Sequence, residues 1–474
     1  MYNLEELTIA RFHESLKQGE ITCEGLIHAY LQRIEVVDRR VNSIITVNPA
    51  ALDRARELDV AYAKGGLVGP LHGVPVLLKD NCETHDMPTT MGSKCLEGWQ
   101  SGKDSYVARK LRDAGAIILA KTNLHEFAMW GETVGSLVGQ TYNPYDFTRT
   151  PGGSSGGTGA ALAANLGIVG IGTDTGQSVR SPASACAVCG LRPTTGLIDT
   201  FGIMAYSHTQ DAVGPMARTV EDTVRVLDVL AGGGQRPTSY IEYLKPDGLR
   251  GKRIGLIESF WGAEKINRPV NDVIRGAMDI LRGAGAELIS ISEYIDSDYV
   301  IQQISVQMYE LRANFAEYME PFGKHTPVRS IGDIIESGKY VPAIEKLLHT
   351  VNGLSMDDTE YYKRLQRIEE TKVKMREIME RESLDAFAFP HQQQLVCKVG
   401  GSQLQRNGVL ASVIGWPSIS VPAGFSAPDD HAPIGVPVGL EIITRANDEA
   451  GLLQIAYGFE QAGHYRRKPV LELD

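Results

Sequence analysis

Apolar residues near the start of the chain recur at the three- and four-residue spacing that is typical of amphipathic helices. Residues 22–37 follow this spacing, and Thr22 stands where a helix N-cap is expected. The apolar face of this segment carries Leu26, Ile27, Tyr30, Leu31 and Ile34. Residues 50–64 repeat the pattern, so positions 1–70 are predicted to form N-terminal helices.

From position 71 the pattern changes to short apolar runs that are bounded by glycine and proline. These runs are GVPVLLKD at 73–80, AIILAKT at 116–122 and GIVGIGT at 167–173. Runs of this length without polar alternation indicate strands that are buried on both faces. A helical pattern at 105–113 lies between the first two runs. Buried strands that alternate with helices predict an α/β fold with helices on both faces of a sheet.

The second half of the chain continues this alternation. An amphipathic helix is predicted at 218–231, followed by a polar connector at 232–250. Residues 296–385 are mostly helical in pattern and rich in Tyr, Glu and Lys, which indicates an inserted helical region beside the sheet. The other predicted segments are strands at 252–259, 286–292, 386–390, 417–425 and 438–444, and helices at 269–284 and 447–462.

No internal repeat or low-complexity tract divides the chain, so a single domain over residues 1–474 is expected. Within the insertion, an apolar stripe at helical spacing is expected to pack into the core, with contact of some members to the substrate as the alternative. It consists of Met308, Tyr309, Leu311 and Phe315. The parts of the domain are helices at 1–70, a core at 71–231, a strand-helix-strand unit with the helical insertion at 251–385, and the C-terminal part of the core at 386–474.

The charge balance limits the classes of partner. The chain has 47 Lys and Arg against 58 Asp and Glu, a net charge of −11, and no run of basic residues. This balance argues against binding to nucleic acid or to an anionic membrane. The first twenty residues lack the apolar stretch of a signal peptide, and the weakly polar stretch 159–172 is too short to cross a bilayer. A cytoplasmic enzyme is therefore expected.

The six cysteines are too sparse for a disulfide framework. Cys186 and Cys189 have the spacing of a Cys-x-x-Cys pair, but no second pair and no nearby histidines complete a zinc site. We therefore expect buried, reduced thiols and no metal.

One of the buried runs ends in a charged residue. Lys79 closes the run GVPVLLKD, where burial forces a lysine either to pair with an anion or to lose its proton. A salt bridge with the adjacent Asp80 is one interpretation. The other is a lysine that desolvation keeps neutral, so that it can act as a base.

Glycine is concentrated around two serines. Residues 151–183 contain nine glycines, and Ser154 and Ser178 lie in this stretch 24 residues apart. Backbone N–H groups at a helix start can bind a phosphate, but the loop closes with Gly157-Thr158-Gly159 and lacks the G-K-S/T ending of a phosphate loop. Nucleotide binding is therefore disfavoured. The glycines instead allow backbone and hydroxyl groups to converge on one reacting carbon.

Ser178 follows a short strand in a turn that Gly176 keeps tight. A serine in such a turn exposes its hydroxyl while successive backbone N–H groups face the same point, which suits a nucleophile beside an oxyanion hole. The stretch lacks the G-x-S-x-G pattern, and no histidine lies nearby, so a Ser-His-Asp triad is disfavoured. The candidate base is Lys79.

At this point the chain resembles the amidase signature family. The motifs that carry the resemblance are, in order, GVPVLLKDN, PGGSSGG, GTDTGQSVRSPA, CGLRPTTGLI, GPMARTVED and GWPSISVPAG. They span residues 70–230 and 386–445. The resemblance implies an α/β/α sandwich around a large mixed sheet, no cofactor, and a Ser–cis-Ser–Lys triad. Lys79 would then be the base, Ser154 the bridging serine after a cis peptide bond, and Ser178 the nucleophile.

The resemblance also implies supporting roles. The oxyanion hole would be formed by the backbone amides of Thr175, Gly176, Gln177 and Ser178. Ser155 would be an accessory hydrogen-bond partner, and Asp174 and Arg180 would brace the loop. A lysine that acts as a base near neutral pH needs a pKa roughly three units below its ordinary value of about 10.4, a shift that burial can produce.

One position departs from the family pattern, because Gln177 stands where a glycine usually precedes the nucleophile. Gln177 is predicted to line the substrate pocket or to hydrogen-bond the active-site loop, and a tolerated substitution is the alternative. Met129 and Trp130 are candidates for the acyl pocket or for the core. The histidines are scattered and are assigned no catalytic role: His125, His208 and His391.

The resemblance, together with these residues, implies an amidohydrolase that cleaves the C–N bond of a small amide, anilide, hydrazide or carbamate through an acyl-enzyme. The nearest alternative is the amidase subunit of a tRNA-dependent amidotransferase, which has similar motifs, acts mainly on glutamine and works beside partner subunits. A catalytically silent binding or scaffold protein is disfavoured because all three triad positions are present. A homodimer is an expectation, since dimers are common among similar proteins.

Overall fold

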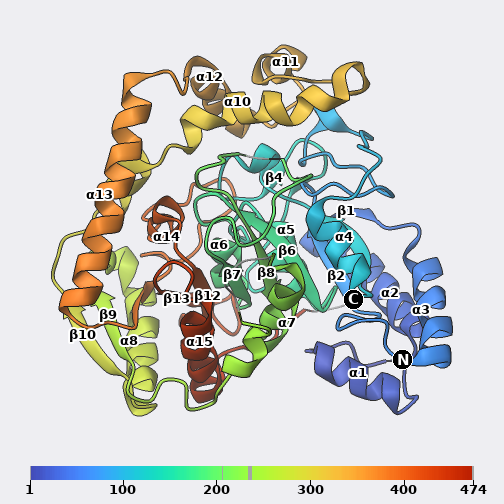
Figure 1. Ribbon diagram of the computed structural model, residues 1–474, viewed down its shortest axis with the longest axis horizontal. Helices are drawn as coiled ribbons and strands as arrows, with labels where there is room; N and C mark the ends of the chain where they lie inside the picture. The colour runs from blue at the N-terminus through green and yellow to red at the C-terminus, as the bar shows by residue number, and fades with distance from the viewer. Residues whose placement is uncertain (1, 205, 233–236, 472–474) are drawn as a thin grey trace.

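The computed structural model describes residues 2–204, 206–232 and 237–471 and is built around a mixed sheet of 11 strands (Figure 1). The order across the sheet is β1-β3-β2-β6-β8-β7-β12-β13-β11-β9-β10. β2 is parallel to β3 and β6, whereas β8 is antiparallel to β6 and β7. The strands are β1 Ile44–Val47, β2 Pro75–Lys79, β3 Ile117–Thr122, β6 Val169–Asp174, β7 Cys189–Arg192, β8 Ala212–Ala217, β9 Arg253–Ile257, β10 Glu287–Ile291, β11 Ala386–Pro390, β12 Ser418–Phe425 and β13 Pro437–Ile443. A separate ribbon pairs β4 Val134–Gly135 with β5 Gly139–Gln140.

Helices cover both faces of this sheet. One layer consists of helices that contact one another in succession: α4 Tyr106–Asp113, α7 Val220–Leu230, α15 Glu449–Gly463 and α8 Arg268–Gly283. On the other face, α5 Gly156–Ala163 and α6 Arg180–Ala185 pack on the central strands. Strands covered on both sides need apolar residues at every position, which explains the continuous apolar runs in the sequence. The expected α/β/α sandwich around a mixed sheet is confirmed.

The N-terminal segment forms the predicted helices, α1 Ile9–Lys17, α2 Cys23–Val41 and α3 Ala51–Gly65. The Thr22 side chain accepts a hydrogen bond from the backbone N–H of Gly25, so Thr22 is the N-cap of α2. Of the predicted apolar face of α2, only Leu31 is half-buried, and the other members are buried. α2 packs on α3 and α5, which ties the N-terminal helices to the core.

The insertion forms an arch of helices along the top and left of the molecule in Figure 1. Its members are α9 Ser297–Tyr299, a π-helix Val300–Ile304, α10 Gln307–Met319, α11 Ile331–Ser337, α12 Glu345–Gly353 and α13 Thr359–Arg381. Three residues of the apolar stripe on α10 are buried, and Met308 is partly buried. The ring of Phe315 meets that of Phe127 edge-on at 5.8 Å. The stripe therefore packs into the core, as predicted.

Three strands of the main sheet, β1, β7 and β8, are absent from the sequence-based expectation, as are the two short strands β4 and β5. β7 and β8 contain Gly190, Gly214 and Pro215, which are residue types that disfavour strands. A Cβ on Gly214 would lie 2.0 Å from the Leu191 carbonyl oxygen, so this glycine is required by close contact between the two strands. Packing in the centre of the sheet therefore overrides local propensity here.

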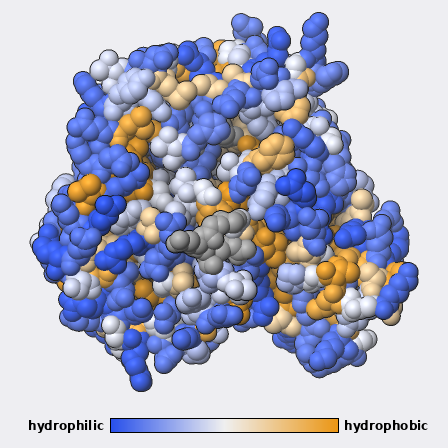
Figure 2. Space-filling view, in the orientation of Figure 1, coloured by the Kyte–Doolittle hydropathy of each residue, from blue (hydrophilic) through white to orange (hydrophobic). Residues whose placement is uncertain are grey.

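The face of the molecule in Figure 2 is mostly hydrophilic, with separated apolar areas. Across the described ranges, each helix is too short or too polar to span a membrane. All six cysteines are free. Five of them, including Cys186 and Cys189, are buried as expected, whereas Cys397 is half-buried.

Candidate active site

The topology of the sheet brings the candidate residues to one edge. β2 and β6 are adjacent and parallel, so their carboxyl ends lie at the same edge, where open α/β sheets bind ligands. Lys79 is the last residue of β2, and Asp174 is the last residue of β6. The loop after β6 carries Ser178 and leads into α6, whereas Ser154 lies just before α5.

Lys79 is wholly buried, and no carboxylate of the described residues lies within ion-pair distance of it. Its Nζ lies 2.8 Å from Ser154 Oγ and 2.8 Å from Thr173 Oγ1. Asn81 donates to the same Thr173 hydroxyl at 3.0 Å. Burial lowers the pKa of the Lys79 amine to about 7. A large fraction of the amine is then uncharged at neutral pH and able to accept a proton.

The salt-bridge interpretation of Lys79 is wrong. Asp80 pairs with Lys121 of β3 at 3.4 Å and accepts a hydrogen bond from the Thr90 N–H at 3.0 Å. Because successive residues of an extended chain point to opposite sides, Asp80 faces away from the Lys79 amine. The carboxylate next to Lys79 in sequence is therefore committed to a different lysine.

Ser154 lies in a turn that requires glycine. The peptide bond between Gly153 and Ser154 is cis, in agreement with the resemblance. A Cβ on Gly153 would come within 2.8 Å of the Gly131 backbone, so no larger residue fits. The Ser154 carbonyl accepts from the His125 N–H at 3.0 Å, and the Ser155 hydroxyl donates to the Thr173 carbonyl at 3.3 Å. Ser155 is thus held against the end of β6, and Ser154 against the backbone of His125.

The loop at 175–179 offers free backbone donors. Within the described part of the chain, the N–H groups of Gly176, Gln177 and Ser178 donate no hydrogen bond. Unpaired N–H groups ahead of a helix are suited to stabilise a developing oxyanion. The N–H of Thr175, the fourth residue predicted for this role, is also unpaired among the described residues, while its hydroxyl donates to Asp211.

The second contact of the predicted relay is not formed in this structure. The Ser178 side chain is partly exposed, and its hydroxyl has no hydrogen bond to Ser154 or to any other described residue. The two serine loops are joined through the backbone, because the Ser155 N–H donates to the Ser178 carbonyl at 3.1 Å. Catalytic hydrogen bonds often tighten only when substrate binds. The relay from Ser178 to Ser154 stays a prediction.

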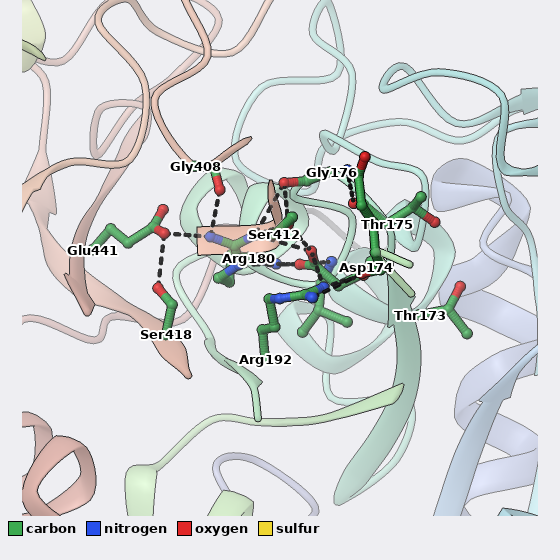
Figure 3. Close-up of polar contacts among 12 residues, drawn as sticks. Thr173, Asp174, Thr175, Gly176, Arg180, Arg192, Gly408, Ser412, Ser418 and Glu441 are labelled. Atoms are coloured by element: carbon green, nitrogen blue, oxygen red, sulfur yellow. Dashed lines mark hydrogen bonds and ion pairs between the residues drawn. The ribbon is translucent and has the colours of Figure 1, made fainter. Parts of the chain in front are cut away.

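A buried network of charges holds this loop, as Figure 3 shows. Arg180 donates to both carboxylate oxygens of Asp174, at 2.9 Å and 3.1 Å, and pairs with Glu441 of β13. Arg192 of β7 lies 3.3 Å from the same aspartate. Burial alone would raise the pKa of Asp174, but the charges of Arg180 and Arg192 lower it well below its usual value. Asp174 and Arg180 thus contact each other beside the loop that the resemblance implies they brace.

The network also fixes the direction of one loop peptide (Figure 3). The Gly176 carbonyl accepts from the Ser412 hydroxyl at 2.6 Å and from Arg180 at 3.0 Å. The carbonyl and the N–H of one trans peptide unit point in opposite directions. The Gly176 carbonyl and the Gln177 N–H belong to the same peptide unit. Holding this carbonyl against Arg180 therefore turns the Gln177 N–H away from the charged network.

A narrow cavity of about 30 Å³ lies beside Ser178, with room for about two water molecules. The predicted pocket residues Met129, Trp130 and Gln177 all line it. Gln177 is only 2% exposed, and neither atom of its side-chain amide has a hydrogen-bond partner among the described residues. The structure thus places Gln177 at the pocket, without the predicted hydrogen bond to the loop.

Other residues of the site were missed by reasoning from sequence. Ile301, Gln307 and Arg406 also line the cavity, but they lie in segments without a motif, and no signal in the sequence identifies them. Arg192 and Glu441 could have been found, because each is a lone charge in an apolar strand. The same signal singled out Lys79.

The histidines lie outside the candidate catalytic contacts. His391 Nδ1 lies 2.6 Å from Glu441, behind the brace, and His208 is on the surface. Burial lowers the pKa of His125 to about 3, so its ring is neutral. In the described ranges, no three His, Cys, Asp or Glu side chains are grouped as a metal site requires.

The fold and this edge of the sheet are those of an enzyme class that acts on C–N bonds. A family model described as Amidase matches residues 25–453, and the chain belongs to this family.

The relatives are of two kinds. The chain is 34% identical to the glutamyl-tRNA(Gln) amidotransferase subunit of Thermoanaerobacter pseudethanolicus, over 98% of each chain. It is also 34% identical to the solved peptide amidase from Stenotrophomonas maltophilia, with a TM-score of 0.88 and 99% of each chain covered. The solved glutamyl-tRNA(Gln) amidotransferase subunit of Thermotoga maritima is 25% identical, with a TM-score of 0.76 over 100% of this chain and 98% of that one. The comparisons fix the family and leave both kinds of activity open.

Proposed function

We propose that the protein is a free-standing amidohydrolase that cleaves a small amide-like substrate through an acyl-enzyme on Ser178. The observation that carries this proposal is the 2.8 Å contact between Lys79 Nζ and Ser154 Oγ, at a wholly buried amine. An amine that is uncharged near neutral pH is a suitable base for a serine hydroxyl.

The reaction begins with a bond from Ser178 Oγ to the substrate carbonyl carbon. As this bond forms, the Ser178 proton passes to Ser154, and the Ser154 proton passes to Lys79. The free N–H groups of residues 176–178 stabilise the negative charge on the carbonyl oxygen. Lys79 then returns a proton through Ser154 to the amine nitrogen while the C–N bond breaks. Water repeats the sequence on the acyl-enzyme, which releases the acid and restores Ser178.

An amidotransferase subunit is the second candidate function. It is favoured by the relative of that name in Thermoanaerobacter pseudethanolicus, which is matched over 98% of both chains. The site would then release ammonia from glutamine, beside partner subunits that hold tRNA. The likeness to the solved peptide amidase, with a TM-score of 0.88, supports an amidohydrolase.

The purified chain, assayed without other proteins, distinguishes these functions. We expect hydrolysis within a panel of alkyl amides, anilides, hydrazides and carbamates, no ammonia from glutamine, and labelling of Ser178 by a fluorophosphonate, located by mass spectrometry. Ser178→Ala is the unlabelled control. Ammonia from glutamine alone, or only with partner subunits present, would favour the amidotransferase. Neither turnover nor labelling would favour a protein without catalytic activity.

Gln177 is proposed as a residue that binds substrate, because its buried amide has no partner among the described residues. For Gln177→Gly we expect KM on the best substrate to rise about five-fold while kcat changes less than about two-fold, as uniform binding is lost. Steady-state kinetics measure both constants. Unchanged values would leave Gln177 as a tolerated substitution. The cytoplasmic location, the homodimer and the division into parts of one domain stay predictions.

A further inference from the structure

Arg406 is the one charged residue among the described residues that line the cavity beside Ser178. It is half-buried, and its guanidinium forms no hydrogen bond and no ion pair with any described residue. A guanidinium carries five N–H donors, and a half-buried one that lines a cavity can offer them to a ligand. The cavity therefore holds a cationic group whose donors the chain itself does not use.

The backbone on both sides of Arg406 is fixed. Asn407 is wholly buried and donates from Nδ2 to the carbonyls of Phe260 at 2.9 Å and Pro390 at 2.8 Å. The Gly408 carbonyl accepts from Arg180 of the brace at 2.7 Å, a contact that Figure 3 shows. Arg406 therefore extends from a rigid support that is tied to the loop of Ser178.

The side chain of Arg406 is also oriented. Its Cζ lies 4.3 Å from the centre of the Trp130 ring, and the indole N–H of Trp130 donates to Ser402 Oγ at 3.0 Å. A guanidinium stacked on an aromatic ring keeps its in-plane donors available for two parallel hydrogen bonds to a carboxylate. The stacking thus prepares Arg406 for a planar anion.

The charges that face Arg406 do not occupy it. Glu132 and Asp298 act on it at longer range, beyond ion-pair distance, and Tyr206 is the other titratable group nearby. Glu132 is already engaged, because it accepts from the Gln403 N–H at 2.9 Å and from the Ser402 hydroxyl at 3.3 Å. None of the described residues that line the cavity is acidic.

A second polar group in the same cavity also lacks a partner. The Gln177 amide is 2% exposed, with neither its oxygen nor its nitrogen hydrogen-bonded among the described residues. A buried amide without partners in the chain indicates that a ligand supplies them. Arg406 and Gln177 together provide a charged and a neutral contact for one substrate beside Ser178.

We propose that Arg406 binds a carboxylate on the substrate, so that the preferred substrates are amides that carry a carboxylate and no ammonium group. This inference rests on the amidohydrolase function proposed above. Free glutamine fits less well, because its ammonium group would enter a cavity whose described lining has a cation and no acid. The carboxylate lies in the part of the substrate that reaches the Trp130 side of the cavity.

Matched pairs of substrates test the proposal. Succinamate is compared with butanamide for a carboxylate on the acyl side, and 4-acetamidobenzoate with 4-methylacetanilide for one on the amine side. In at least one pair, we expect the native enzyme to favour the carboxylate by about 30-fold in kcat/KM, as charged hydrogen bonds allow. Arg406→Leu is expected to abolish this preference, while kcat/KM for the neutral substrate changes less than about three-fold. Lys398→Leu removes an exposed positive charge from the same segment. It is expected to change neither the preference for the carboxylate nor kcat/KM for the neutral substrate.

Binding to Ser178→Ala, measured by calorimetry with the same compounds, reports on Arg406 independently of turnover. If Ser178→Ala/Arg406→Leu binds the carboxylate compounds more weakly than Ser178→Ala does, the inference is supported, even if the native enzyme shows no hydrolysis and the proposed function fails. Equal affinity for both members of each pair, or an equal loss of both on removing Arg406, would overturn it. Preference for the neutral members by the native enzyme would overturn it as well.

Discussion

Replacing Lys79 with alanine is expected to lower kcat/KM at pH 7 by about a thousand-fold, because a general base contributes roughly a hundred- to ten-thousand-fold. Burial lowers the pKa of Lys79 to about 7, and the uncharged amine is the active form. In the native enzyme, kcat/KM should therefore fall as the pH drops below about 7 and reach a plateau above it. In Lys79→Ala this limb should disappear. A pH–rate profile from pH 5.5 to 9 measures both effects.

Lys121 provides the matched control, since it is also wholly buried and lies on the adjacent strand β3. Lys121→Ala removes the ion pair with Asp80 and the hydrogen bond to the Cys82 carbonyl, so it should lower Tm. Its remaining activity should keep the same midpoint near pH 7. If Lys79→Ala retained more than a tenth of the native turnover at pH 7, a lysine-dependent mechanism would be excluded.

Replacing Arg180 with methionine is expected to lower the free energy of unfolding by about 3–5 kcal/mol, because it leaves buried carboxylates without their main partner. Burial alone would raise the pKa of Asp174 and of Glu441, and the charge of Arg180 is the largest influence that lowers each. Carboxyls with a lowered pKa stabilise the fold above their unfolded pKa, and this contribution is lost as the pH falls through the folded pKa. Arg180→Met loses that contribution to the free energy of unfolding. The cost of leaving Asp174 and Glu441 charged and buried then falls only as these two acids become protonated.

The deficit of Arg180→Met should therefore be largest near pH 7.5 and smaller near pH 5, where the unpaired acids can take up protons. Urea unfolding at the two pH values measures it. Ser412→Ala is the control, because it removes an uncharged donor from the same network and should cost about 1 kcal/mol at both pH values. A loss that does not depend on pH in Arg180→Met would mean that volume, and not charge, dominates at this position.

The centre of the fold is predictable from sequence because its strands are covered on both faces. The segments 116–122 and 386–390 are apolar at almost every position, and they form β3 and β11 within a residue of the predicted bounds. β8 shows the limit of this signal. Its glycine and proline disfavour a strand locally, and only contacts with distant β6 and β7 make it one.

The candidate site divides in the same way. Lys79, Ser154 and Ser178 can be found because a lone lysine in a buried run and hydroxyls among glycines are local signals. Arg406 and Ile301 have no such local signal. Their position at the cavity depends on how the insertion and the loop before α14 (Val409–Ile414) pack over the edge of the sheet. In the proposed function, substrate specificity therefore depends on the part of the site that local patterns do not reveal.

The brace also has a consequence for how the protein is made. Arg180 pairs with a glutamate that lies 261 positions further along the chain, on strand β13. All three candidate catalytic residues have therefore left the ribosome long before the partner that holds their loop is synthesised. In a nascent or truncated polypeptide, Arg180 can already pair with Asp174, but the loop lacks its contacts with Gly408, Ser412 and Glu441. We expect competence to hydrolyse to arrive only when the last strands join the sheet.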